Sequence, residues 1–132
     1  MANEQYITFK IEGKIYGINI SDIIDIYEKM NGIRIPNAQD YIESVINLRG
    51  DVVVLISLKK KLKINKKVEE NYIIICEKDK EKYGLLVDNI EGIINVTKVK
   101  EEESEGEYIK GFVEKDGKEI IILNLKNIIN KN

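Results

Sequence analysis

Several residue types are scarce or missing in this chain of 132 residues, which has no histidine, no tryptophan, one cysteine and one proline. Cys76 is the single thiol, so the chain cannot form an internal disulfide. It lies in the apolar run "YIIIC", and without a histidine to activate it, a buried thiol is a better interpretation than a nucleophile. The sequence also lacks a P-loop, a GxSxG motif and a carboxylate pair with an obvious pocket. We therefore expect neither an enzyme nor a bound cofactor.

A strong charge of either sign is missing as well. The 21 basic and 23 acidic side chains leave a net charge of −2, which favours a protein partner over nucleic acid or a membrane surface. The amino-terminal "MANEQYITFK" has neither the basic nor the apolar region of a secretion signal, and no uncharged run approaches the length of a membrane span. With 43% hydrophobic residues the chain can bury a core, so we expect a globular cytoplasmic protein.

Two charged runs are candidates for ion binding, and each has a simpler interpretation. "KKKLKINKKVEE", residues 59–70, could bind anions, but no aromatic residue interrupts it to stack on bases, so we interpret it as a solvated linker. "KEEESEGE", residues 100–107, could bind a divalent cation, but it lacks the spacing and the turn glycine of a calcium loop. We interpret it as a mobile loop, and the sequence predicts neither a nucleic-acid partner nor a metal site.

The chain contains an internal repeat at a shift of 67 residues. "YGINISDIIDI" from Tyr16 matches "YGLLVDNIEGI" from Tyr83, and "YIESVINLRGDVVVLISL" from Tyr41 matches "YIKGFVEKDGKEIIILNL" from Tyr108. Two separated blocks that share one shift are difficult to obtain by chance. The sequence therefore predicts one domain over residues 1–132, made of two similar halves at about 6–65 and 70–130.

Short β-branched runs separated by turn residues indicate an all-β protein. Each half has five such runs, which predicts two small five-stranded barrels that share a core, with room for a strand to be exchanged between the halves. One short helix is expected in "NAQDYIES" after Pro36, and another at 126–129. The strands are expected near residues 6–11, 14–20, 23–28, 45–49, 52–58, 72–77, 83–88, 92–96, 108–114 and 119–125.

One of only two arginines in the chain lies in an expected hairpin turn, within "VINLRGDVVVLISL". The second half builds the same turn with Asp116 and Gly117, a pair that a type I′ turn favours because both positions need positive φ. Arg49 is a poorer residue for that position, which suggests selection for something other than turn formation. The alternative is that a bulge distinguishes the two hairpins and that Arg49 is an ordinary solvated cation.

The segments "YITFKIEGKIYGINISDIIDIYE", "IPNAQDYIESVINLRG" and "YGLLVDNIEGI" together resemble the chemotaxis coupling protein family, CheW, over nearly the whole chain. The "NLRG" run is the most specific of the matching motifs. The resemblance implies two SH3-like five-stranded β-barrels and a non-catalytic adaptor. In that family, the adaptor joins the helical tips of chemoreceptors to the regulatory domain of the histidine kinase CheA, without direct contact with the membrane.

The resemblance implies a receptor-contacting surface at Arg49, with Asn47 and Leu48 beside it. A receptor tip is an α-helical hairpin, and an apolar groove can bind the apolar stripe of such a helix. Arginine at the rim can bind a carboxylate or carbonyl in a bidentate manner, which lysine cannot do. Val45 and Val87 are further candidates for the apolar part of this surface.

The resemblance places a kinase-contacting surface at Ile23, Asp25 and Ile26. Many family members have glutamate where this chain has Asp25, which keeps the charge but shortens its reach. Many members also read V-I-P-V-I-D-L after the marker, whereas this chain reads "VVVLISL", with Val54 in place of proline and Ser57 in place of aspartate. We expect these departures to affect the choice of partners and not the fold.

Two other functions remain open from the sequence. One is a CheW-like scaffold in a different receptor–kinase pathway, and the other is a barrel that binds a ligand or nucleic acid. A related coupling module that carries a response-regulator domain is not expected, because the chain ends soon after "LKNIINKN".

Overall fold

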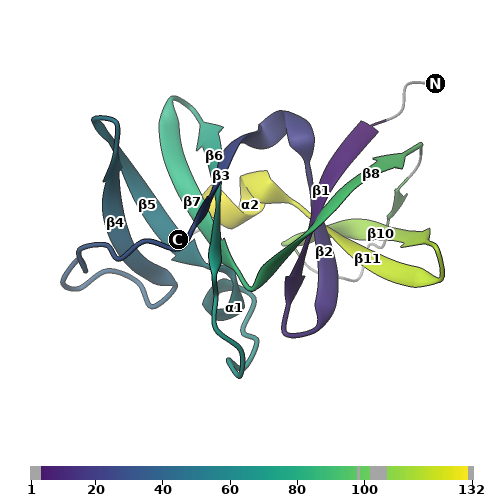
Figure 1. The fold of residues 1–132 in the computed structure, drawn as a ribbon, viewed down its shortest axis with the longest axis horizontal. Coiled ribbons are helices and arrows are strands. Elements are labelled where there is room, and N and C mark those ends of the chain that lie inside the picture. The colour runs from purple at the N-terminus through teal and green to yellow at the C-terminus, as the bar shows by residue number, and fades with distance from the viewer. Residues whose placement is uncertain (1–3, 98, 102–106, 131–132) are drawn as a thin grey trace.

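A computed structural model describes residues 4–97, 99–101 and 107–130, so most of the expected acidic loop at 100–107 lies outside the described residues. The described part is mostly β-structure, with a few short helical segments (Figure 1). In chain order, the elements are β1 Glu4–Ile11, β2 Lys14–Asn19, the 3₁₀ turn η1 Ile20–Asp22, β3 Ile23–Glu28, β4 Ile42–Leu48, β5 Asp51–Ser57, α1 Leu58–Lys61, β6 Tyr72–Lys78, β7 Glu81–Val87, β8 Asn89–Val96, β9 Lys100–Glu101, β10 Ile109–Lys115, β11 Lys118–Leu123 and α2 Leu125–Asn130.

The strands form two sheets that lie at opposite ends of the molecule in Figure 1. One sheet has the order β3-β6-β7-β5-β4, and an antiparallel bridge between Ile33 and Val45 joins the segment after β3 back to β4. The other has the order β8-β1-β2-β11-β10, extended at one edge by the two-residue strand β9. This arrangement confirms the all-β class and the two small barrels.

The first hairpin of each half of the chain lies in the sheet of the other half. β1 and β2 pair with β8 and β11, whereas β6 and β7 pair with β3 and β5. The exchanged element is therefore a whole hairpin in each direction. Because each sheet contains strands from both halves, neither half can complete its barrel without the other.

The register of these pairings repeats at a shift of 67 residues. Tyr16 lies opposite Ile121 in the parallel pair β2–β11, and its counterpart Tyr83 lies opposite Val54 in the parallel pair β7–β5. The antiparallel pairs show the same relation, since Ile7 faces Ile93 and Ile74 faces Ile26. We infer from this agreement that an approximate twofold axis relates the two halves.

A central core joins the sheets, and each barrel has a smaller core of its own. The central cluster contains fully buried residues from both hairpins, among them Phe9, Ile18 and Leu85. Val53 and Ile73 belong to the core of one barrel, and Ile122 belongs to the core of the other. Burial of these apolar side chains is the main favourable contribution to folding.

The helices agree only in part with the expectation. α2 covers the helix expected at 126–129, whereas the segment after Pro36 forms turns instead of a helix. α1 was not expected, and it begins at Leu58 because the side chain of Ser57 accepts a hydrogen bond from the backbone N–H of Lys60. Among the described residues, no helix has both the length and the apolar character needed to cross a membrane.

Candidate protein-interaction surfaces

The β4–β5 turn presents Arg49 in a conformation that side chains other than those of asparagine, aspartate and glycine rarely adopt. Arg49 has φ 52° and Gly50 has φ 89°, and the counterparts Asp116 and Gly117 have φ 53° and 77°. The two turns therefore share one backbone geometry, and a bulge does not distinguish them. Asn47 supports the turn directly, because its Oδ1 accepts a hydrogen bond from the N–H of Gly50 at 3.0 Å.

The guanidinium of Arg49 is exposed and forms no hydrogen bond or ion pair with any described residue. The nearby carboxylate of Asp51 is already bound to Lys82 of β7. Arg49 therefore presents its donors to solvent from a turn whose geometry it does not favour, and stabilisation of the turn does not explain its presence.

The apolar residues expected beside Arg49 differ in their exposure. Leu48 is half-buried and packs against the core of its barrel, and Val45 is half-buried next to the bridge with Ile33. Val87 is fully buried, with 0% of its surface exposed, so the prediction that its side chain contributes to a surface is wrong. Ile33 and Val52 are exposed apolar residues that the sequence did not single out.

β3 lies at an edge of its sheet, where it pairs only with β6 over Ile23 to Glu28. Ile23 and Ile26 are half-buried against the central core, whereas Asp25 is exposed and its Oδ1 accepts a hydrogen bond from the N–H of Ile26 at 2.8 Å. The most exposed apolar side chain of the strand is Ile24, at 48%. The sequence alone did not distinguish Ile24 from its isoleucine neighbours, because a register shift between residues 23 and 25 interrupts the alternation along β3.

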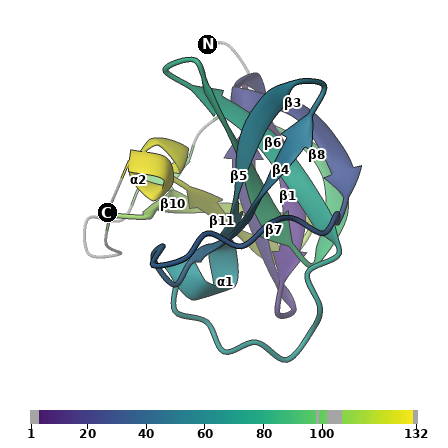
Figure 2. The ribbon, with the colours of Figure 1, turned by 90° about the vertical axis from the view of Figure 1, so that its left-hand side faces the viewer.

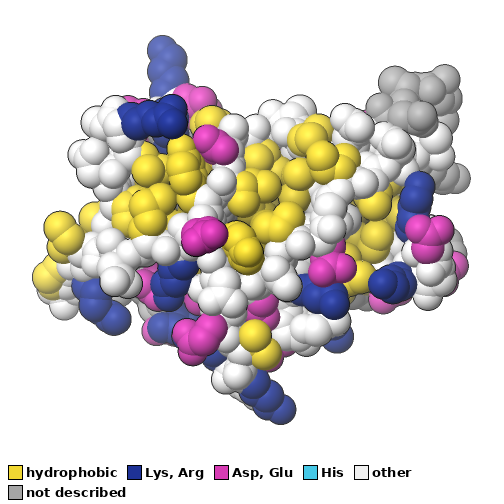
Figure 3. Space-filling model, in the orientation of Figure 1, with side chains coloured by type: hydrophobic (Ala, Val, Ile, Leu, Met, Phe, Trp, Pro, Cys, Tyr) yellow, Lys and Arg dark blue, Asp and Glu magenta, His cyan; other side chains and the backbone are white. Residues whose placement is uncertain are grey.

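Apolar side chains form a broad band across the face of the molecule seen in Figure 3. In the same orientation, β3, β8 and β1 run across this face (Figure 1). The exposed Ile24 and the half-buried Ile26 belong to β3, and the exposed Ile93 and the half-buried Ile90 belong to β8. Contiguous apolar surface on a small protein commonly marks a site of protein association.

A buried charged cluster joins the two halves of the chain. Lys59 of α1 is only 1% exposed, and its Nζ lies 2.5 Å from Glu12 Oε2 and 2.8 Å from Asp88 Oδ1. Burial alone would lower the pKa of Lys59, but the contacts with both carboxylates raise it. The bond from Lys59 and the backbone N–H groups of Lys67 and Val68 lower the pKa of Glu12 from 4.5 to about 2.

The interpretation of residues 59–70 as a solvated linker is therefore wrong at its ends. Lys61 is also buried, with its Nζ 3.6 Å from the centre of the Tyr41 ring and 5.5 Å from that of Tyr108. Glu70 is buried as well, and it accepts a hydrogen bond from Ser57 Oγ at 2.8 Å. Lys59, Lys61 and Glu70 are buried because each has a partner elsewhere in the fold, and local composition does not reveal these partners.

The described residues contain no group of three or more histidine, cysteine, aspartate or glutamate side chains that could hold a metal ion. Burial raises the pKa of the Cys76 thiol to about 12, so this thiol stays protonated at neutral pH. The described structure thus presents a two-barrel β-protein with exposed surfaces suited to binding other proteins.

Comparison with known proteins agrees with this class. A family model described as CheW-like domain matches residues 5–132. The chemotaxis protein CheW of Thermotoga maritima is 28% identical over 131 residues, covering 95% of this chain and 87% of that protein. CheW of Bacillus subtilis is 35% identical over 118 residues, covering 87% of this chain and 72% of that protein.

A solved structure shows the same fold. The crystal structure of the scaffolding protein TtCheW from Thermoanaerobacter tengcongensis superposes with a TM-score of 0.91 at 27% identity, covering 99% of this chain and 95% of that one. The chain belongs to the CheW-like family, whose members act as scaffolds in chemotaxis.

Proposed function

We propose that this chain is a non-catalytic cytoplasmic adaptor that couples the helical tips of chemoreceptors to the regulatory domain of the histidine kinase CheA. The family match over residues 5–132 supports the general role, and the exposed surfaces on β3 and on the β4–β5 turn support two separate contacts. An adaptor needs two surfaces that can be occupied at the same time.

The proposed receptor surface is centred on Arg49, whose exposed side chain is the main support for the proposal. Its guanidinium is exposed and free of partners among the described residues, on a turn for which aspartate or asparagine is better suited. Asn47 holds the turn in place, and Val45 lies on the same face of β4 as Asn47, whereas Leu48 lies on the opposite face. A receptor helix can pack its apolar stripe against Val45 and the exposed Val52, which pairs with Asn47, and offer a carboxylate or a carbonyl to Arg49.

The proposed kinase surface is the β3 edge, with Ile23, Asp25 and Ile26. Ile24 extends this surface, because it is the most exposed apolar residue of the strand. An exposed strand edge can pair with another β-domain through backbone hydrogen bonds, and Asp25 and Ile24 can then select the partner.

A three-component binding experiment tests the proposal. The wild-type chain is expected to join a receptor cytoplasmic fragment and the CheA regulatory domain in one complex on size-exclusion chromatography. Ile24→Asp and Asp25→Lys are expected to lose only the kinase domain, and Arg49→Ala only the receptor fragment. Ile23→Asp is a less useful variant, because this half-buried side chain packs against the core and its loss would also destabilise the fold.

The outcome also separates the alternatives. If the wild-type chain binds neither partner while thermal melts show a folded protein, the adaptor proposal is wrong for this pair. Binding to another receptor–kinase pair would then indicate a scaffold of a different pathway. Salt-sensitive binding to an oligonucleotide without binding to either protein would indicate the nucleic-acid module.

A further inference from the structure

The segment between β3 and β4, residues 29–41, contains two exposed asparagines that belong to no helix or strand, Asn31 and Asn37. Figure 2 shows this segment crossing the near side of the molecule. Asn31 is the one asparagine of the chain that a glycine follows, whereas an alanine follows Asn37. The two residues therefore allow asparagine chemistry to be compared within one exposed segment.

Gly32, which follows Asn31, lies very close to β4. Ile33 and Val45 exchange two backbone hydrogen bonds, each of 2.9 Å, and these bonds hold the segment against the strand. A Cβ at Gly32 would lie 2.5 Å from both Ser44 Oγ and the carbonyl oxygen of Val45. Because Ser44 is buried and has little room to move, the packing requires glycine at position 32.

The groups of Asn31 and Gly32 that can react with each other have no other partner in the described structure. Neither the side chain of Asn31 nor the N–H of Gly32 forms a hydrogen bond with any described residue. Because glycine has no Cβ, nothing shields its backbone nitrogen from the neighbouring side chain. At the other asparagine, by contrast, Ala38 carries a Cβ and its N–H donates to the carbonyl of Ile35 at 3.4 Å.

We propose that Asn31 is a site of spontaneous deamidation, with water as the second reactant. The backbone nitrogen of Gly32 attacks Cγ of Asn31 and closes a succinimide ring, and the side-chain nitrogen leaves as ammonia with the proton from Gly32. Water then opens the ring by breaking one of its two bonds to nitrogen. Cleavage at Cγ gives aspartate, and cleavage at the main-chain carbonyl gives isoaspartate, in which the chain continues through the former side chain.

Either product changes the surface beside β4. A carboxylate replaces a neutral amide, which adds one negative charge to a chain whose net charge is −2. Isoaspartate also adds one carbon to the main chain directly before Gly32, where the contacts with Ser44 and Val45 leave no space. We therefore expect the two hydrogen bonds between Ile33 and Val45 to open in the isoaspartate form. This inference does not depend on the proposed receptor and kinase contacts, since it follows from the chemistry of one residue pair.

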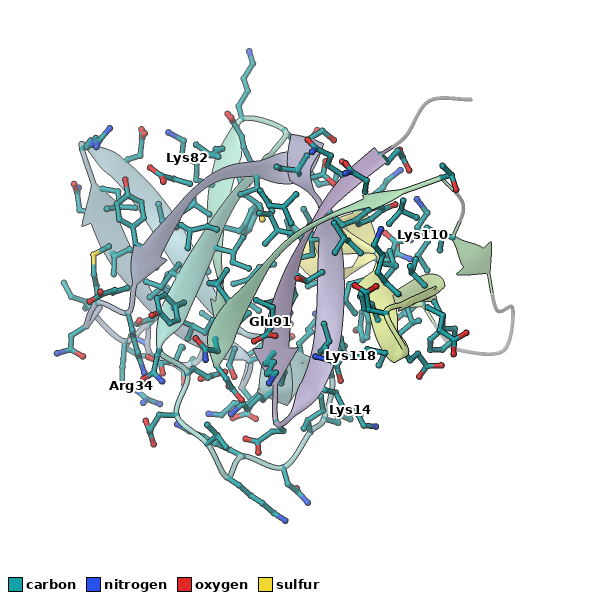
Figure 4. All side chains as sticks on the ribbon, turned by 45° about the vertical axis from the view of Figure 1, so that its right-hand side comes forward. Lys14, Arg34, Lys82, Glu91, Lys110 and Lys118 are labelled. Carbon is teal, nitrogen blue, oxygen red and sulfur yellow. The ribbon has the colours of Figure 1, made fainter. Side chains whose placement is uncertain are left out.

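The test follows the folded full-length chain during storage in a warm, mildly alkaline buffer. Trypsin, added at the end, cleaves after Lys29 and Arg34 and so places Asn31 and Asn37 on different peptides. Figure 4 shows Arg34 at the periphery of the molecule. Mass spectrometry measures the exchange of amide for acid in each peptide, and chromatography separates isoaspartate from aspartate. We expect the product to accumulate at Asn31 faster than at Asn37.

Two matched variants and one structural measurement complete the experiment. Asn31→Gln is expected to lose the product, because its longer side chain closes a ring much more slowly, whereas Asn37→Gln is expected to leave it unchanged. Both positions are exposed, so both variants should fold. In the converted protein, the amides of Ile33 and Val45 should exchange with deuterium faster than in the fresh protein.

The two parts of the proposal fail separately. Conversion at Asn31 that occurs only in urea, or that proceeds equally at Asn37, would overturn the proposed site. Unchanged deuterium exchange at Ile33 and Val45 in protein converted to isoaspartate would overturn the proposed effect on the contact with β4.

Discussion

Arg49 and Asp116 occupy the same position in two β-turns related by 67 residues, and their φ angles are 52° and 53°. Aspartate tolerates this left-handed conformation better than arginine does, and each turn continues with a glycine at still larger φ. The pair is therefore an internal comparison in which the backbone is held constant and the side chain differs. The difference points to a use for the guanidinium outside the turn.

The buried cluster around Lys59 gives a first prediction about stability. Lys59→Met removes the cation that bridges Glu12 and Asp88 and leaves two carboxylates without it, so we expect a loss of about 3 kcal/mol or more in the free energy of unfolding. Lys126→Met, at the exposed counterpart, is the matched control and is expected to stay within about 0.5 kcal/mol of wild type. Urea denaturation of the three proteins measures both values, and similar losses in the two variants would contradict the assignment.

A second prediction concerns pH. The pKa of Glu12 is about 2 in the folded protein against an ordinary 4.5, so the unfolded chain holds this proton more tightly than the folded one. The contact therefore stabilises the fold above pH 4.5, and this stabilisation is lost as the pH falls toward 2. Glu12→Gln should be less stable than wild type at neutral pH, and the difference should narrow on acidification. Denaturation curves of both proteins from neutral pH to about pH 2 measure this difference in the free energy of unfolding. A difference that does not change with pH would contradict the prediction.

The two Tyr-Gly pairs of the repeat allow a third prediction. A Cβ at Gly84 would lie 2.6 Å from Leu55 Cδ2 and 2.7 Å from Ile73 Cγ2, both in the packed core. At Gly17 the nearest atom would be Ile122 Cδ1, at 3.1 Å. Gly84→Ala should therefore cost about 1–3 kcal/mol by overpacking, and Gly17→Ala less than about 1 kcal/mol. Thermal melts of the two variants compare these losses, and a larger loss in Gly17→Ala than in Gly84→Ala would contradict the prediction.

The local features of the fold could be predicted from the sequence because they depend on local chemistry. Alternating β-branched residues and turn glycines such as Gly50 and Gly117 mark the hairpins, and the shared shift of 67 residues marks the repeat. Local sequence does not determine which strands pair with each other. The exchange of hairpins between sheets depends on which apolar faces fit together. A fold with this exchange and a fold without it would show the same alternation of apolar and polar residues along each strand.

The candidate surfaces were predicted less completely for a similar reason. Arg49 stood out because its counterpart provided a comparison within the chain. Val87 was misplaced because an apolar strand residue at a core position and one at an interface look the same in sequence. Lys59 and Lys61 looked like solvated charges, since their carboxylate and aromatic partners come from distant segments.

Substitutions at Arg49 distinguish a role in stabilising the turn from a role in binding the receptor. Arg49→Asn suits the positive φ better than arginine, so we expect the free energy of unfolding to stay the same or to rise by up to about 1 kcal/mol. Arg49→Ala should remain within about 0.5 kcal/mol of wild type, as at an ordinary surface site. Arg49→Lys keeps the charge but not the bidentate geometry, and it should weaken receptor binding if both donors are used.

The most direct measurement is a calorimetric titration of a receptor cytoplasmic fragment into wild type, Arg49→Asn and the matched variant Asp116→Asn, with a thermal melt of each protein. We predict that Arg49→Asn melts no lower than wild type but loses about 2 kcal/mol or more of binding free energy, and that Asp116→Asn binds like wild type. Wild-type affinity in a folded Arg49→Asn variant would contradict it.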